Sequence, residues 1–229
     1  VAYSGMERFF PADKILMTGN PVRQNLLENK ISKEEARKSF GLDPNKKTVL
    51  MIGGSLGART MNESVLAHLD EIRQSDVQFI WQTGKYYSQS IAEELNKQAE
   101  VPNMKVMDFI SSMDNAYAAA DIVVSRAGAS SISELCLLGK PSILVPSPNV
   151  AEDHQTKNAQ ALSNQRAAIL VTDKEAKDKL IGIALKTVAD DTQLMSLGEN
   201  AKKLAFLNSA DVIAEEVYKL AVEYNNKKK

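Results

Sequence analysis

Residues 48–59 read TVLMIGGSLGAR: an apolar run that ends at Ile52, a turn with three glycines, and a helical pattern that begins near Arg59. Glycine lacks a Cβ, so it accepts a positive φ and lets a ligand approach the backbone closely. A strand, such a turn and a helix, in that order, bring a phosphate to the free N–H groups and the positive dipole end of the helix. Taken alone, the stretch is equally compatible with a phosphate-binding loop and with a tight connection that binds nothing.

Similar short apolar runs recur along the chain and alternate with helical patterns. Strands are expected at residues 15–18, 48–52, 78–82, 104–106, 122–125, 142–145 and 168–171. Helices are expected between them at residues 33–40, 59–74, 88–99, 112–119, 131–138 and 154–164, and three amphipathic segments follow at residues 174–188, 192–207 and 210–224. Most of the strands are apolar on both faces, as central parallel strands are. The alternation predicts an α/β fold built on a doubly wound parallel sheet.

Composition excludes several classes of protein. The net charge is −1 over 229 residues, and no basic face is indicated outside the closing lysines, so nucleic acid is not an expected partner. No apolar run approaches the roughly 20 residues of a transmembrane helix. Cys136 is the single cysteine, which excludes an internal disulfide and fits a reducing cytoplasm. A soluble globular protein is therefore expected.

Ligands of a doubly wound sheet bind in the crevice at the carboxyl ends of the strands, so the residues after each strand are candidates. Arg23, in TGNPVR, opens a helical turn at the edge of the crevice, where the helix dipole slightly disfavours a cation. Ser55, in the glycine-rich turn, offers a hydroxyl and an N–H group. Gln155 follows the strand at 142–145 and offers a donor and an acceptor to a sugar hydroxyl.

Residues 126–135, RAGASSISEL, form a second turn with glycine and serine ahead of a helix. Ser131 and Glu134 fit a capping box, in which the glutamate at the third helical position reaches back to the cap. The cap leaves Gly128 and its two alanine neighbours unexplained, and these small residues leave space over the helix end. Two such helix ends in one crevice suggest a diphosphate, and a carboxylate one turn beyond suits ribose hydroxyls.

Neither a metal ion nor a cofactor is expected. Glu152, Asp153 and His154 are adjacent, but neighbours in sequence rarely converge on one ion, and no second histidine lies nearby. Asp153 is instead expected near a helix N-cap. No Asp-x-Asp pair follows a strand to hold Mg²⁺ on a nucleotide diphosphate. The helix ends would have to neutralise the diphosphate.

Five motifs, in the order GNPVR, GGSLGAR, DFISSM, ADIVVSRAGASSISEL and EDHQTKNA, resemble the C-terminal half of the MurG family. That family of bacterial glycosyltransferases moves N-acetylglucosamine from UDP-GlcNAc onto the muramyl-pentapeptide pyrophosphoryl lipid and so makes lipid II. The match runs from about Val1 through the last strand region. The resemblance implies an inverting enzyme with a GT-B fold of two Rossmann-like domains, of which the C-terminal domain holds the donor.

The resemblance also implies roles for individual residues. The residues that would bind UDP-GlcNAc are Arg23, Ser55, Ile110, Ala129, Ser130, Ser131, Ile132, Ser133, Glu134 and Gln155. Arg23 and the turn at 109–110 would border the uracil, and Ser55 would meet the diphosphate. The N–H groups of residues 129–131 would hold the phosphates, and Glu134 would bind the ribose hydroxyls instead of capping its own helix. Gln155 would contact the sugar, whereas Thr156 stands where many family members have a second glutamine, which puts a second sugar contact in question.

The resemblance further implies a longer protein, as the start at Val1 also suggests. Residues 1–18 would be the end of an acceptor domain with an interdomain strand, 19–208 the UDP-GlcNAc-binding domain, and 209–229 a C-terminal helix with a basic tail. The acceptor half would bind lipid I and supply the catalytic histidine. This chain alone is therefore expected to bind the donor without turnover, and only the full-length protein would associate with the cytoplasmic face of the bacterial inner membrane.

Two alternatives remain open. One is a stand-alone nucleotide-sugar-binding subunit that needs a partner chain. The other is a different GT-B enzyme that uses UDP-GlcNAc, such as a 2-epimerase or a glycolipid synthase. The GNPVR and EDHQ motifs argue against this last alternative.

Overall fold

The computed structural model describes residues 1–2, 6–23 and 25–227, and its centre is a six-stranded sheet. The strands are β1 (Thr48–Ile52), β2 (Gln78–Gln82), β3 (Met104–Met107), β4 (Ile122–Ser125), β5 (Ser142–Leu144) and β6 (Ile169–Leu170). All of them pair in parallel, in the order β3-β2-β1-β4-β5-β6. This is the strand order of a Rossmann-type doubly wound sheet, so the expected fold class is confirmed.

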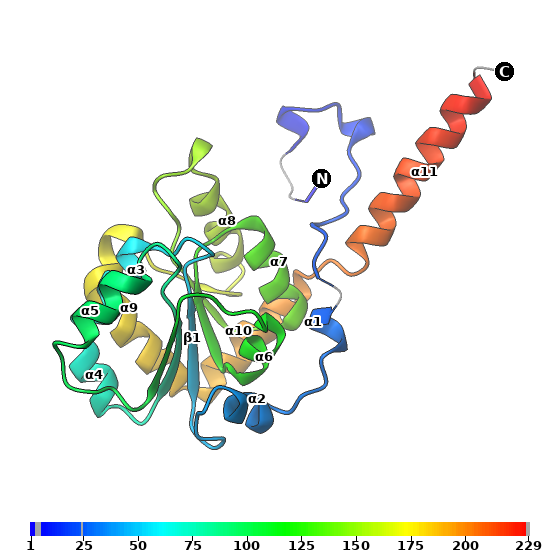
Figure 1. Ribbon diagram of the computed structural model, residues 1–229. Coiled ribbons are helices and arrows are strands. Elements are labelled where there is room, and N and C mark those ends of the chain that lie inside the picture. Colours follow the sequence, from blue (N-terminus) through cyan, green and yellow to red (C-terminus); the bar gives the residue numbers. More distant parts are fainter. Residues whose placement is uncertain (3–5, 24, 228–229) are drawn as a thin grey trace.

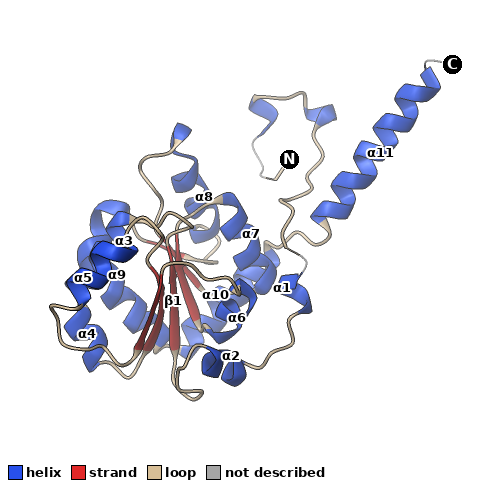
Figure 2. Cartoon of the chain, in the orientation of Figure 1, coloured by secondary structure: helices blue, strands red, loops and turns tan. Residues whose placement is uncertain are grey.

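Helices cover both faces of the sheet (Figure 1, Figure 2). One face carries α3 (Arg59–Ala67), α4 (Leu69–Gln74), α5 (Ser88–Leu95) and α9 (Asp173–Val188). The other carries α1 (Asn25–Glu28), α2 (Lys33–Ser39), α6 (Met113–Ala119), α7 (Ala129–Leu138), α8 (His154–Ser163) and α10 (Asp191–Lys203). Along β1, Val49 and Met51 belong to the core of the first face, and Leu50 and Ile52 belong to the core of the second. Because both faces are buried, this strand is apolar at successive positions.

The segment at residues 15–18 is not a strand of the sheet, so that prediction was wrong. Its backbone is extended, but its hydrogen bonds run to the chain start: the Thr18 N–H donates to the Val1 carbonyl, and the Val1 ammonium donates to the Leu16 carbonyl. Leu16 and Met17 are exposed. An apolar run becomes a strand of a sheet only where a neighbouring strand can pair with its backbone N–H and C=O groups. This segment follows the 3₁₀ turns Met6–Arg8 and Ala12–Lys14 and lies outside the sheet.

Several helix boundaries also differ from those expected. The helix expected at 59–74 is two helices, because His68 leaves the helical region (φ −124°, ψ 26°) between α3 and α4. The helix expected at 88–99 ends at Leu95. More important for the site, the helix expected to start at Ser131 begins two residues earlier, at Ala129.

The last helix, α11 (Ser209–Lys227), extends away from the body of the molecule and its described end lies far from the sheet (Figure 1). Val217, Tyr218, Leu220 and Tyr224 on this helix are all at least 60% exposed. The final lysines of the basic tail, residues 228 and 229, lie outside the described residues. None of the described helices is long and apolar enough to cross a bilayer.

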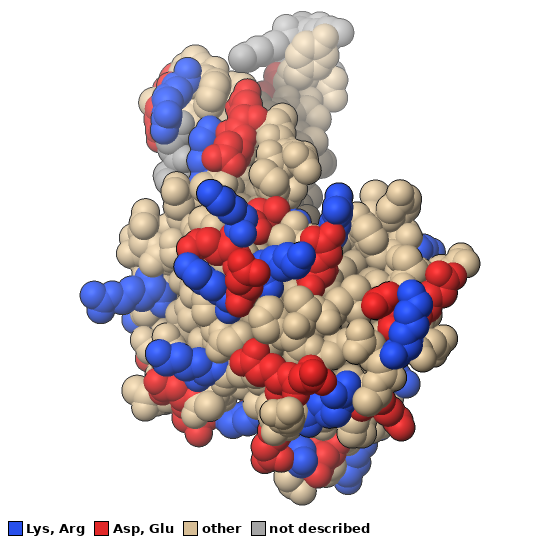
Figure 3. All heavy atoms as spheres, turned by 90° about the vertical axis from the view of Figure 1, so that its left-hand side faces the viewer, with Lys and Arg blue, Asp and Glu red and all other residues tan. Residues whose placement is uncertain are grey.

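On the face that carries α3, α4, α5 and α9, side chains of both charges are interleaved (Figure 3). Some of them pair along one helix, as Arg59 does with Glu63 at 2.7 Å and Lys179 with Glu175 at 2.7 Å. Exposed pairs of this kind contribute little to stability. This face therefore shows the mixed charge of an ordinary solvated surface.

A buried carboxylate at the amino end of β4 has a larger structural role. Asp121 accepts hydrogen bonds from Arg37 at 2.6 Å, from Lys33 at 2.8 Å and from the Thr48 N–H at 2.7 Å. Burial raises the pKa of Asp121, but the hydrogen bonds from Lys33 and Thr48 and the charges of Lys33 and Arg37 outweigh burial and hold that pKa below its ordinary value. The network joins α2 to the start of two central strands.

Candidate functional site

The main cavity, about 920 Å³, opens at the carboxyl edge of the sheet. The connections of β1 and β4 leave for opposite faces there: β1 leads to α3 and β4 leads to α7. Such a switch point is where doubly wound sheets bind their ligands. Both turns line the cavity, together with the loops that follow β3 and β5.

Turn geometry accounts for the glycines between β1 and α3. Gly54 and Gly57 have φ of +86° and +85°, which favours glycine. A Cβ on Gly57 would lie 2.2 Å from the Thr83 carbonyl oxygen, and one on Gly53 would lie 2.5 Å from the Ala58 nitrogen. The glycines are therefore needed with or without a ligand. Ser55, which is exposed at the tip of the turn, lines the cavity.

The N-termini of α3 and α7 border this cavity without a side-chain cap. The N-cap residues are Ala58 for α3 and Gly128 for α7, and neither accepts a hydrogen bond through its side chain in the described structure. By contrast, Ser32, Thr172 and Asp190 cap α2, α9 and α10 with their side-chain oxygens. The first turns of α3 and α7 also hold no acidic residue. An uncapped N-terminus leaves N–H groups and a positive dipole end that an anion can satisfy.

The capping-box interpretation of Glu134 was wrong. Since α7 begins at Ala129, Glu134 lies inside the helix and not in its first turn, out of reach of a cap. Its side chain is 11% exposed and lines the cavity. The Oε1 atom accepts from Nε of Arg23 at 3.1 Å and forms an ion pair with Nη2 at the same distance, and Oε2 accepts from the Tyr117 hydroxyl at 2.9 Å.

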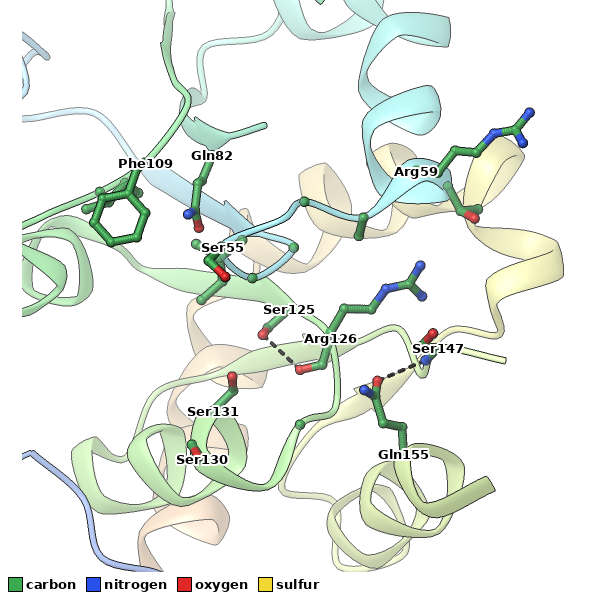
Figure 4. A pocket seen from close by; sticks show the side chains of 18 of the residues that line it. Ser55, Arg59, Gln82, Phe109, Ser125, Arg126, Ser130, Ser131, Ser147 and Gln155 are labelled. Carbon is green, nitrogen blue, oxygen red and sulfur yellow. Dashed lines mark hydrogen bonds between the residues drawn. The ribbon is translucent and has the colours of Figure 1, made fainter. Parts of the chain in front are cut away.

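Gln155 and Thr156 are adjacent in α8, but only Gln155 lines the cavity. The Ser147 N–H donates to Oε1 of Gln155 at 2.9 Å, which fixes the carboxamide at the cavity wall (Figure 4). Thr156 donates to Oδ1 of Asp153 at 2.6 Å and does not line the cavity. Asp153 is the N-cap residue of α8, as expected, although its backbone is left-handed and its side chain makes no capping bond.

Arg126 is a cavity residue that the sequence reasoning did not single out. Its Nη1 donates to the Val145 and Pro146 carbonyls at 3.2 and 3.1 Å and pairs with Asp173 at the start of α9. Among the described residues, Nε and Nη2 of Arg126 have no hydrogen-bond partner. The sequence could have indicated Arg126 as a candidate, because it is the first residue after β4 and opens the RAGASS turn.

The structure brings most of the predicted residues together on the cavity wall: Arg23, Ser55, Ile110, Ser130, Ser131, Glu134 and Gln155. Ser130 and Ser131 at the start of α7 lie across from Ser55 (Figure 4). Ala129, Ile132 and Ser133 do not line it. Ile132 is buried in the core, and its N–H donates to the Gly128 carbonyl within the helix. The Ser133 hydroxyl donates to the Ala129 carbonyl and accepts from Asn20.

The loop after β3 closes one side of the cavity. Ile110 is buried, whereas the Phe109 ring is 45% exposed at the mouth, with the Lys85 ammonium 5.5 Å from its centre. Among the described residues, no group of three or more His, Cys, Asp or Glu side chains is placed to hold a metal ion. The cations and helix ends of the wall are therefore the groups that the described cavity offers to an anion.

Residues 48–217, which include both uncapped helix ends, match the model of the glycosyltransferase family 28 C-terminal domain. The chain belongs to this family. The resemblance inferred from the five motifs is thereby confirmed at the level of the family.

Two curated relatives of this glycosyltransferase family 28 domain, both from Bacteroides, carry the same name. The chain is 63% identical, over 96% of its length, to the UDP-N-acetylglucosamine--N-acetylmuramyl-(pentapeptide) pyrophosphoryl-undecaprenol N-acetylglucosamine transferase of Bacteroides fragilis. It is 60% identical, over 98% of its length, to the protein of the same name from Bacteroides thetaiotaomicron. The chain spans 58% and 61% of the lengths of these two curated relatives.

A solved structure supports the fold independently. The crystal structure of MurG from Acinetobacter baumannii superposes with a TM-score of 0.72, over 95% of this chain and 59% of that one. The two sequences are 24% identical. The shared fold thus persists where the sequences have diverged widely.

Proposed function

We propose that this chain is the UDP-GlcNAc-binding half of an inverting N-acetylglucosaminyltransferase that makes lipid II for peptidoglycan. The observation that carries the proposal is the pair of uncapped helix N-termini, those of α3 and α7, at one cavity. Two such ends suit the two phosphates of a nucleotide sugar. The names of the relatives from Bacteroides, at about 60% identity, specify UDP-N-acetylglucosamine as the donor.

The proposed roles follow the order of groups along the cavity. Ser55 and the first turn of α7, at Ala129, Ser130 and Ser131, would hold the diphosphate with hydroxyl and N–H groups. Glu134, one turn further along α7, would accept from the ribose hydroxyls. The free donors of Arg126 add positive charge beside the diphosphate. The geometry offers no ligand-facing group from Ile132 or Ser133, so we leave these two residues out of the site.

At the two ends of the proposed donor, Ile110 and Arg23 would border the uracil, and Gln155 would contact the sugar. The Ser147 N–H takes one of the two acceptor positions on the carboxamide oxygen of Gln155 and holds this group in place, so its NH₂ group can donate to a sugar oxygen. Thr156 donates to Asp153 and would give no second sugar contact.

In the proposed reaction an acceptor hydroxyl attacks the anomeric carbon of the donor, the bond from that carbon to the diphosphate oxygen breaks, and UDP leaves. The base that removes the hydroxyl proton would belong to the acceptor half. Both histidines of this chain are engaged elsewhere: Nδ1 of His68 contacts the Ser64 carbonyl at 2.8 Å, and Nδ1 of His154 contacts the Ala151 carbonyl at 2.9 Å. Neither residue lines the cavity.

The proposed division of the chain assigns residues 19–208 to the donor domain and residues 1–18 and 209–229 to the connection with an acceptor domain. The exposed apolar side chains of α11 and of Phe9 and Phe10 support this division, because exposed apolar surface of this extent marks a contact. In the full-length protein this contact would be with the lipid I-binding half, at the cytoplasmic face of the inner membrane.

UDP is expected to bind this chain without any metal ion, because two helix ends can neutralise the diphosphate. Calorimetric titrations with UDP should give the same affinity in EDTA and in Mg²⁺, within about twofold. A large loss of affinity in EDTA would show that the diphosphate is neutralised in a different way.

Transfer is expected only when an acceptor half is supplied. The purified chain, given UDP-GlcNAc and lipid I, should form no lipid II above background, and a continuous protein that adds an N-terminal half from a relative should form it. Product formed by this chain alone would contradict the division of labour. If the chain became active only with a separately encoded partner, the stand-alone subunit would be favoured instead.

A further inference from the structure

Tyr117 of α6 contacts the proposed ribose ligand, Glu134, from inside the protein. Its side chain is 2% exposed and belongs to the core between α6 and the sheet. Alanines surround it in sequence, at 116, 118 and 119, so the ring has room between closely packed elements. Tyr117 lines the cavity, and its hydroxyl donates to Oε2 of Glu134 at 2.9 Å.

The two partners of Glu134 differ in how firmly they are held. The Arg23 side chain is 50% exposed, whereas Tyr117 is packed in the core. Burial, followed by the charge of Glu134, raises the pKa of Tyr117, so its hydroxyl keeps its proton and stays a donor throughout the ordinary pH range. The position of Oε2 therefore depends on a rigid donor, and the position of Oε1 depends on a more mobile one.

The acceptor capacity of the carboxylate limits what a ligand can gain. Each carboxylate oxygen has two lone pairs. Oε1 already accepts one hydrogen bond from Nε of Arg23, with Nη2 paired to it at 3.1 Å, and Oε2 accepts one from Tyr117, which leaves one free position on each oxygen. The two ribose hydroxyls can use these two positions, and the one on Oε1 lies beside the Arg23 guanidinium. Tyr117 can keep its bond throughout.

We propose that Tyr117 is the positioning residue for ribose recognition: its hydroxyl holds Oε2 of Glu134 at the cavity wall, so that the carboxylate selects nucleotides with ribose hydroxyls. Tyr117 itself makes no contact with the ribose. The inference rests on the proposed function, since it assumes that UDP occupies this cavity.

The test compares UDP with 2′,3′-dideoxyuridine diphosphate, which lacks both hydroxyls. In the Tyr117→Phe chain, UDP affinity should fall by about three- to tenfold, less than for loss of a charge-assisted bond to the ribose itself, because the carboxylate is kept and only its position is loosened, while the affinity for the dideoxy analogue stays within about twofold. Discrimination between the two nucleotides therefore shrinks. Tyr87→Phe is the matched control, because Tyr87 lines the same cavity and its hydroxyl does not contact Glu134.

Two further results separate the possible failures. In a Glu134→Gln background, Tyr117→Phe should have a much smaller effect on discrimination, since the two changes act on one interaction. If Tyr117→Phe weakens both nucleotides equally, or leaves discrimination intact, the tyrosine is only a core residue and the inference is overturned. If the parent chain binds neither nucleotide, the proposed function has failed instead.

Discussion

Replacement of Glu134 by glutamine is expected to weaken UDP binding by about ten- to a hundredfold, or roughly 1.4–2.8 kcal/mol. The carboxylate would accept charge-assisted hydrogen bonds from the ribose, which are worth about 1.5–3 kcal/mol. An amide must turn its NH₂ group toward a donor, either the ribose, Tyr117 or Arg23. Titration calorimetry of parent and variant with UDP measures the difference directly.

Glu63→Gln is the matched control for this change. Glu63 lines the same cavity, but it lies on α3 and pairs with Arg59 at the surface. Its replacement should leave UDP affinity within about threefold, since an exposed ion pair contributes little. A Glu134→Gln chain that binds UDP as tightly as the parent would remove Glu134, and with it Tyr117, from the site.

The largest expected effect on stability comes from Asp121→Ala. This change leaves the Arg37 guanidinium buried without its carboxylate, and it removes the acceptors of Lys33 and of the Thr48 N–H. Breaking a buried ion pair on one side costs about 3–5 kcal/mol. Urea unfolding should show a loss of this size, and the UDP affinity of the folded fraction should change little, because Asp121 lies at the opposite end of β4 from the cavity.

Asp76→Ala provides the control, since Asp76 pairs with Lys46 at 2.8 Å but its side chain is 89% exposed. Its loss should cost less than about 1 kcal/mol. Equal losses for the two variants would show that the Asp121 network contributes no more than a surface pair.

The same network gives stability a pH dependence with a definite sign. The folded-state pKa of Asp121 lies below its ordinary value, which is about 3.9 in an unfolded chain. Its contribution is therefore fully present above about pH 5 and is lost as the pH falls through the folded-state pKa. The acid sensitivity of the parent in this range should be reduced in the Asp121→Ala chain.

Most of the sheet could be predicted from the sequence because its strands are buried on both faces. A short run such as residues 48–52, which is apolar at every position, is typical of a central parallel strand that helices cover on both faces. Residues 15–18 have a similar pattern but no neighbouring strand, and pairing is decided by tertiary structure. The break at His68 likewise leaves the apolar periodicity of the two helices largely unchanged, so periodicity alone could not show it.

The cavity could be located from sequence for a topological reason, since residues after parallel strands converge at one edge. Ser55, Ser131, Glu134 and Gln155 were found in this way. The contacts of Glu134 could not be found, because they depend on where α7 starts and on Tyr117, which is far from it in the chain and resembles an ordinary core aromatic. Arg126 was overlooked although its position after β4 satisfied the same rule.

A crystal structure of this chain with UDP bound tests the central claim most directly. The diphosphate is expected between the N-termini of α3 and α7, with its oxygens within about 3.2 Å of the N–H groups of Ser130 and Ser131. The ribose would lie against Glu134, with Tyr117 still bonded to Oε2. UDP bound elsewhere on the chain, with this cavity empty, would show that the cavity is not the nucleotide site.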